Sequence, residues 1–231
     1  MILGLDPSLR NFGWTLISDD GSFLDKGTMK TEASEVFVTR YMYLRDGLKS
    51  LIREIREKHP EEVLKIGIES PIFNDLYSEG MYGLFLYSNE ALMLEKVDTV
   101  YLSPNQVKAH AAYFLNRPKG WKMGKSDRVD AAKQATEGQG AKRWNNHQAD
   151  AFWVARVANR FWLLMDGQIK EDDLTPLERK HFTSLEKFQR GKKAGKVKRK
   201  GLSHKEDDRF FRWSQTCLAS PFDPPNSSTS S

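Results

Sequence analysis

The sequence contains a single cysteine, Cys217, among its 231 residues, so no disulfide bond can form within the chain. The same scarcity excludes a zinc module built from several cysteines and is typical of proteins in a reducing compartment. No apolar run approaches the roughly 18 residues of a membrane-spanning helix, and the first residues lack the basic and apolar regions of a secretory signal. We therefore expect a cytoplasmic protein with no membrane partner.

The sequence also lacks an internal repeat, and its hydrophobic content of 39% is typical of a globular chain rather than a disordered one. Its net charge of +5 is unevenly distributed, because residues 190–200 (RGKKAGKVKRK) contain seven basic residues and no acidic one. The remaining residues therefore carry a small net negative charge. A concentrated basic segment favours a nucleic acid as the partner, and a solubilising tail is the alternative.

The first part of the chain predicts a β-sheet. Short apolar segments at 1–6, 12–18 and 21–28 are separated by turns and predict an antiparallel meander. Apolar residues at helical spacing predict a helix over 35–58, and a strand over 63–69 follows it. Because this strand comes after a helix, we expect it to pair in parallel with an earlier strand.

The second part of the chain predicts mainly helices. A helix over 74–96, interrupted at Gly80 and Gly83, precedes a short strand at 99–102. The segment SPNQ (103–106) has the pattern of a capping box and begins another helix. Further helices are expected at 126–137, 146–165, 175–189 and, more weakly, 204–216. The fold class is therefore α/β, with a mixed five-stranded sheet flanked by helices.

Acidic residues end two of the predicted strands. Asp6 follows the first apolar segment, and Glu69 ends the parallel strand. Ligands gather at the carboxyl ends of parallel strands, so both side chains belong to a candidate site. His147 and Asp150, in NNHQADAFW, are three residues apart and share one face of a helix. Three converging carboxylates and an imidazole repel one another without a cation, which suggests Mg²⁺ or Mn²⁺ bound by all four residues.

This group of residues suggests metal-dependent cleavage of a nucleic-acid backbone. Two ions about 3.5–4 Å apart activate a water and stabilise the leaving oxygen of a phosphodiester. Asp6 would bridge the ions, Glu69 and Asp150 would each hold one, and His147 would bind metal or move a proton. Each residue also has an ordinary explanation: Asp6 as a turn former, and His147 as part of a helix cap.

Three segments resemble a known family. ILGLDPSLRNFGW, IGIESPIF and HQADAFWVARVA resemble, in this order, the acidic motifs of RuvC-type Holliday junction resolvases, some of which are phage or viral proteins. The resemblance covers roughly residues 1–165. It implies a ribonuclease H-like fold and a homodimer that cleaves four-way DNA junctions with two divalent ions; a viral member would act in the host cytoplasm. The helical segment 76–93 would pair the subunits, with burial on its own sheet as the alternative.

The resemblance also suggests which residues contact DNA. Lys108 and Lys125 match family lysines that bind the DNA backbone or assist catalysis, with solvated helix lysines as the alternative. Phe73 is a candidate for stacking on unpaired bases, with core packing as the alternative. The segment 111–124 is longer and more basic than its family counterpart, which suggests an added DNA-facing loop. The remaining candidate DNA-binding residues are Lys119, Lys122, Arg190, Lys192, Lys193, Lys196, Lys198, Arg199 and Lys200.

We expect a nuclease domain at 1–166 and a helical, basic extension with a disordered end at 167–231. Two other functions use the same fold: a nuclease for other branched DNA or for RNA–DNA hybrids, and a junction-binding protein that does not cleave. A nucleotide cofactor is not expected, because GWKMGKS (120–126) has one residue too few between its glycines for a phosphate-binding loop.

Overall fold

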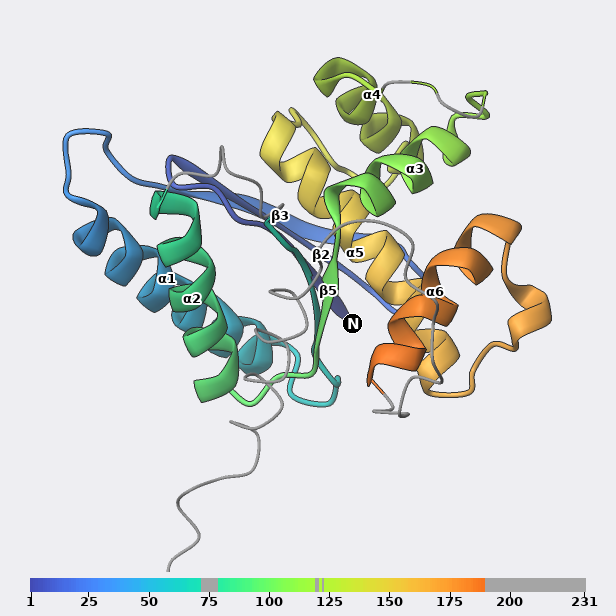
Figure 1. The fold of residues 1–231 in the computed structure, drawn as a ribbon, viewed down its shortest axis with the longest axis horizontal. Helices are drawn as coiled ribbons and strands as arrows, with labels where there is room; N and C mark the ends of the chain where they lie inside the picture. The colour runs from blue at the N-terminus through green and yellow to red at the C-terminus, as the bar shows by residue number, and fades with distance from the viewer. Residues whose placement is uncertain (72–78, 119–120, 122, 190–231) are drawn as a thin grey trace, which may run out of the picture. The chain divides into compact units, whose positions relative to one another are not determined.

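The computed structural model describes residues 1–71, 79–118, 121 and 123–189 (Figure 1). Its centre is a five-stranded sheet in the order β3-β2-β1-β4-β5. The strands are β1 (Ile2–Asp6), β2 (Asn11–Ile17), β3 (Phe23–Lys30), β4 (Lys65–Glu69) and β5 (Thr99–Leu102). The strands β1, β2 and β3 form the predicted antiparallel meander, and β4 pairs with β1 in parallel. The predicted mixed five-stranded sheet is confirmed.

Helices cover both faces of the sheet (Figure 1). One face packs against α1 (Phe37–Lys58) and α2 (Glu79–Leu94). The other face packs against α5 (Asn146–Met165), and α3 (Pro104–Phe114), α4 (Lys125–Ala135) and α6 (Pro176–Gln189) lie against α5 or α3. Within the described residues, these bounds agree with the predicted helices to within a few residues. The weaker helix predicted at 204–216 and the first residues of the helix predicted at 74–96 lie outside the described residues.

The alternation of side chains along β1 separates the two cores. Leu3 and Leu5 belong to the apolar cluster formed with α1 and α2. Ile2 belongs to the cluster formed with α5, and Gly4 and Asp6 share its face because successive residues of a strand point to opposite sides. The carboxylate of Asp6 therefore lies on the face that α5 covers.

The expected interruption of the second helix at its glycines is wrong. The helix α2 runs without a break from Glu79 to Leu94 and includes both Gly80 and Gly83. A Cβ atom on Gly83 would lie 2.5 Å from the ring of Tyr41 on α1, far inside a normal contact. This glycine therefore allows α1 and α2 to pack closely, and helix packing outweighs its low helix propensity.

Local capping signals in the sequence are confirmed at α3. The Ser103 hydroxyl accepts a hydrogen bond from the backbone N–H of Gln106, and the Gln106 side chain accepts one from the backbone N–H of Ser103. Pro104 occupies the first helical position, where a missing N–H carries no cost. The start of α3 is thus fixed by its own sequence.

The segment after α5 packs onto the same core as α5. Leu174 and Phe182 are buried in the apolar cluster of α5, and Arg160 of α5 donates to the carboxylate of Glu178 at 2.9 Å. The predicted domain boundary at residue 166 remains a prediction. In the described part of the chain, no helix combines the length and the apolar character needed to span a membrane.

Candidate functional site

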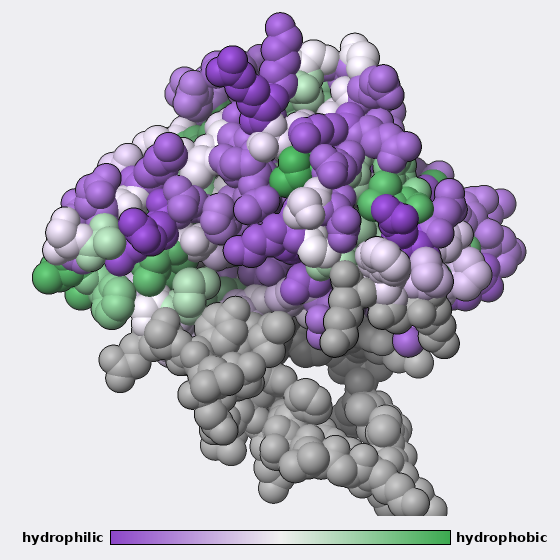
Figure 2. All heavy atoms as spheres, turned by 90° about the horizontal axis from the view of Figure 1, so that it is seen from above, coloured by the Kyte–Doolittle hydropathy of each residue, from purple (hydrophilic) through white to green (hydrophobic). Residues whose placement is uncertain are grey.

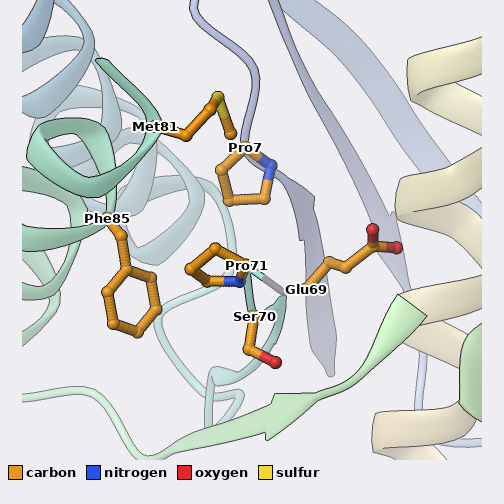
Figure 3. A pocket seen from close by; sticks show the side chains of 6 residues that line it. All are labelled: Pro7, Glu69, Ser70, Pro71, Met81 and Phe85. Carbon is orange, nitrogen blue, oxygen red and sulfur yellow. The ribbon is translucent and has the colours of Figure 1, made fainter. Parts of the chain in front are cut away.

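Asp6 and Glu69 end neighbouring parallel strands. The pairing of β1 with β4 places Ile2 opposite Lys65 and Leu5 opposite Ile68, and each strand ends one residue later, at Asp6 and Glu69. Both side chains lie on the α5 face of the sheet, since they alternate with the residues of the other core. Figure 3 shows the Glu69 carboxylate pointing away from Pro71 and Phe85, which line a small pocket on its other side.

Three glycines allow α5 to approach this face closely. A Cβ atom on Gly4 would lie 2.1 Å from the backbone oxygen of Ala151, and one on Gly67 would lie 2.5 Å from the Cβ of Ala158. A Cβ atom on Gly13 would lie 2.3 Å from the backbone oxygen of His147. Since any side chain at these positions would push the helix away, the glycines set the distance between the α5 residues and the strand carboxylates.

The first turn of α5 is held against the sheet by polar contacts. Asn145 is the N-cap residue and accepts from the backbone N–H of Gln148 at 2.9 Å. The hydroxyl of Thr15 on β2 donates to the backbone oxygen of Gln148 at 3.0 Å. Because Asn145 caps the helix, the side chain of His147 is not used for capping and is available to the site.

His147 makes a direct contact with Asp6. Its ring Nδ1 lies 2.7 Å from Oδ2 of Asp6. This hydrogen bond raises the pKa of His147, and burial raises the pKa of Asp6 although the contact with His147 opposes that rise. The two residues form a proton-sharing pair that is only partly exposed to solvent.

Asp150 forms a second ion pair, with a residue that sequence reasoning missed. Its Oδ1 lies 2.8 Å from Nη1 of Arg128 on α4, and both residues are buried. The pair is close but poorly aligned, because Oδ1 of Asp150 has no hydrogen-bond partner in spite of this short distance. Nε of Arg128 also has no hydrogen-bond partner. Arg128 follows Lys125 by three residues on α4, although the helix was predicted to begin one residue after Lys125, and this spacing was the available signal.

The three carboxyl groups influence one another electrostatically. Burial, followed by the negative charges of Asp6 and Asp150, raises the pKa of Glu69 to about 8. Burial and the charge of Asp6 raise the pKa of Asp150 to about 7. The cluster therefore resists full ionisation near neutral pH unless positive charge is supplied.

The two predicted family lysines lie on the helices that border the site. Lys108 on α3 opposes the rise in the pKa of Glu69 and Asp150, and Lys125 at the start of α4 opposes the rise for Asp6. Lys125 is exposed, so its ammonium group is accessible to a bound polyanion. Both lysines thus add positive potential beside the carboxylates.

The described residues include the donor atoms that a hard divalent ion requires, but these atoms are not arranged closely enough to coordinate an ion. Among residues 1–71, 79–118, 121 and 123–189, no three His, Cys, Asp or Glu side chains are grouped tightly enough to hold an ion. The donor set nevertheless fits Mg²⁺ or Mn²⁺, since it contains three carboxylates, an imidazole and a buried Asp150 oxygen without a hydrogen bond. The predicted ligand set remains a proposal that requires Asp150 to turn from Arg128.

Several predicted DNA-binding residues lie outside the described residues. They are Phe73, Lys119, Lys122, Arg190, Lys192, Lys193, Lys196, Lys198, Arg199 and Lys200. Their assignments remain predictions.

Comparison with known proteins gives one local sequence match and a match of the fold. The crossover junction endodeoxyribonuclease RuvC of Gluconobacter oxydans (strain 621H) is 41% identical over 56 residues, which are 23% of this chain and 33% of that protein. The match thus spans about a third of the length of the relative. No protein-family model matches the chain.

Two solved structures share the fold across most of the chain. Thermus thermophilus RuvC in complex with a Holliday junction substrate superposes with a TM-score of 0.53 and 16% identity, covering 73% of this chain and 97% of that one. A second Thermus thermophilus RuvC structure gives a TM-score of 0.52 and 16% identity, covering 72% and 96%. The chain therefore has the fold of RuvC, the ribonuclease H-like fold that its three acidic motifs imply.

Proposed function

We propose that the protein is a structure-specific endonuclease that cleaves four-way DNA junctions with divalent metal ions and acts as a homodimer. The observation that carries this proposal is the convergence of Asp6, Glu69, His147 and Asp150 at one edge of the sheet. The fold shared with RuvC and the local match to a curated RuvC support the junction as substrate.

The proposed chemistry assigns a role to each residue at this edge. Asp6, Glu69, His147 and Asp150 would hold the divalent ions. When bound, such ions activate water and stabilise the leaving oxygen of a phosphodiester. His147 holds or releases a proton at Nδ1 beside Asp6, because their hydrogen bond keeps the ring oriented and raises its pKa. Lys125 and Lys108 would neutralise DNA phosphates near the bound ions.

The connection between α3 and α4 supports a DNA-facing role. Trp121 in this connection and Tyr113 at the end of α3 are exposed, and the guanidinium of Arg117 lies 5.2 Å from the ring centroid of Trp121. Exposed aromatic rings beside basic side chains provide stacking and phosphate contacts for nucleic acids. We propose that this connection contacts the DNA arms next to the active site.

The homodimer is supported by an apolar surface on α1 and α2. Large hydrophobic side chains are exposed there: Phe37, Val38, Met42, Tyr43, Tyr82, Met93 and Leu94. Figure 2 shows hydrophobic residues gathered at the edge of the molecule on the side where α1 and α2 lie in Figure 1. A surface of this kind suits an interface between two subunits. Two subunits would supply the two cuts that resolve a junction.

Cleavage of a substrate panel tests the proposal. Four-way junctions, three-way junctions, flaps and RNA–DNA hybrids would be incubated with the protein and Mg²⁺ or Mn²⁺. We expect preferential, paired cutting of the four-way junction. Equal cutting of the hybrid and the junction would favour a broader nuclease of the same fold, and binding without cutting would favour a junction-binding protein.

A further inference from the structure

Arg128 is a buried cation among the carboxylates of the proposed site. It is 8% exposed, and its positive charge opposes the rise in the pKa of Asp6, Glu69 and Asp150. A buried arginine usually satisfies its donors with good hydrogen bonds. Here Nε has no partner, and the short contact from Nη1 to Asp150 is poorly aligned. The side chain is therefore held near the carboxylates by charge rather than by a well-formed set of hydrogen bonds.

The main chain around Arg128 is fixed by α5 itself. The indole N–H of Trp153 donates to the backbone oxygen of Arg128 at 3.4 Å. Trp153 follows Asp150 by three residues, so the same face of α5 binds the backbone of α4 and faces its arginine. This contact ties the backbone of Arg128 to α5, whereas Nε of its guanidinium has no hydrogen-bond partner.

The guanidinium and a divalent ion compete for the same oxygens. Oδ1 of Asp150 lies 2.8 Å from Nη1 of Arg128, so the guanidinium occupies space beside this oxygen that a bound ion would need. An ion bound by Asp150 would also lie close to a fixed positive charge, which weakens its binding. In the absence of an ion, however, Arg128 supplies positive charge to a cluster that contains two buried carboxylates, Asp6 and Asp150, and the half-buried Glu69.

We propose that Arg128 is a positioning residue that holds Asp150 in the metal-free protein and must release it when a divalent ion binds. The inference rests on the proposed function, because it concerns the ion that this function requires. It makes Arg128 a determinant of the ion concentration at which the site fills. It also explains why the carboxylates are near one another but not grouped for coordination.

Metal titration of variants without DNA tests the inference. The thermal unfolding midpoint would be followed against Mn²⁺ concentration for the wild type, Arg128→Gln and Arg128→Lys. Fitting each series gives the Mn²⁺ midpoint, which is the concentration that half-fills the site. We expect the Mn²⁺ midpoint of Arg128→Gln to be about 5-fold or more lower than that of the wild type, the lower end of typical coupling between sites. Arg128→Lys keeps the charge but not the planar fork, so we expect a smaller shift in the same direction.

Arg160→Gln is the matched control, because Arg160 also pairs with a buried carboxylate, that of Glu178, outside the site. It should lower stability but leave the Mn²⁺ midpoint at the wild-type value. If Mn²⁺ stabilises the wild type and neither Arg128 variant shifts the midpoint downward, the inference is wrong while the metal site stands. If Mn²⁺ stabilises none of the proteins, the proposed function fails and the inference fails with it.

Discussion

Nδ1 of His147 and Oδ2 of Asp6 lie 2.7 Å apart, although 141 positions separate the two residues in the sequence. The contact joins the first strand of the sheet to the first turn of α5. It depends on the close packing of that helix on glycines of β1, β2 and β4. The geometry of the site is therefore a consequence of how one helix packs on the sheet.

The packing of α5 on Gly4 predicts a loss of stability on substitution. A methyl group at this position would meet the backbone oxygen of Ala151 at 2.1 Å. We expect Gly4→Ala to lower the free energy of unfolding by about 1–3 kcal/mol, as overpacking does elsewhere. Urea unfolding measures this change. Gly124→Ala is the control, because its Cβ would make only an ordinary contact at 3.4 Å with Asp127.

The raised pKa of Glu69 predicts a pH dependence of stability in the absence of metal. Its pKa is about 8 in the folded protein, whereas the ordinary pKa of a glutamate is 4.5, so folding favours the protonated form. The stabilisation is complete below about pH 4.5 and is lost as the pH rises toward about 8. With EDTA, we expect wild-type stability to fall relative to Glu69→Gln between pH 5 and pH 8. Parallel stability profiles of the two proteins would contradict this account.

His147 is expected to act in cleavage and not in DNA binding. We predict that His147→Asn lowers the single-turnover rate of junction cleavage by about 100-fold, since a positioned proton-transfer group contributes at least that much. Its affinity for the junction should stay within error of the wild type. His59→Asn, at the end of α1, serves as the control and should cleave normally. Weakened binding with an unchanged cleavage rate would assign His147 to DNA contact instead.

The basic stretch at 190–200 is expected to bind the DNA backbone. Deleting residues 190–231 removes its seven positive charges, so we expect weaker junction binding and a smaller dependence of affinity on salt. Cleavage at saturating protein concentration should be retained, because the acidic residues lie elsewhere. Binding measured from 50 to 200 mM salt, a range over which phosphate contacts are strongly weakened, checks this. An unchanged salt slope would show that this stretch does not contact DNA.

The local sequence was sufficient to predict most of the fold. Alternating and helical apolar patterns predicted the five strands and the helices, and the SPNQ segment predicted the start of α3. The helix propensity of Gly83 misled the prediction for α2, because its role depends on the distant ring of Tyr41. A local sequence pattern does not predict packing between segments that are far apart in the sequence.

Only part of the site was predictable from the sequence, because it too depends on packing between distant segments. Acidic residues at strand ends and the HQAD segment pointed to the carboxylates and to His147. The pairing of Asp150 with Arg128 was not predicted, because the spacing of Arg128 from Lys125 along one helix does not mark the arginine as buried. Only the docking of α4 on α5 places that guanidinium among the acids.

Cleavage of a synthetic four-way junction by the wild type and by Asp6→Asn tests the central claim most directly. With Mg²⁺ or Mn²⁺, we predict paired nicks from the wild type, and junction binding with cleavage reduced by at least about 100-fold from the variant, since even outer-shell changes at metal sites can cost that much. EDTA should abolish cutting by the wild type. A wild-type protein that binds the junction and cuts with neither ion, or a variant that cuts at the wild-type rate, would contradict the account.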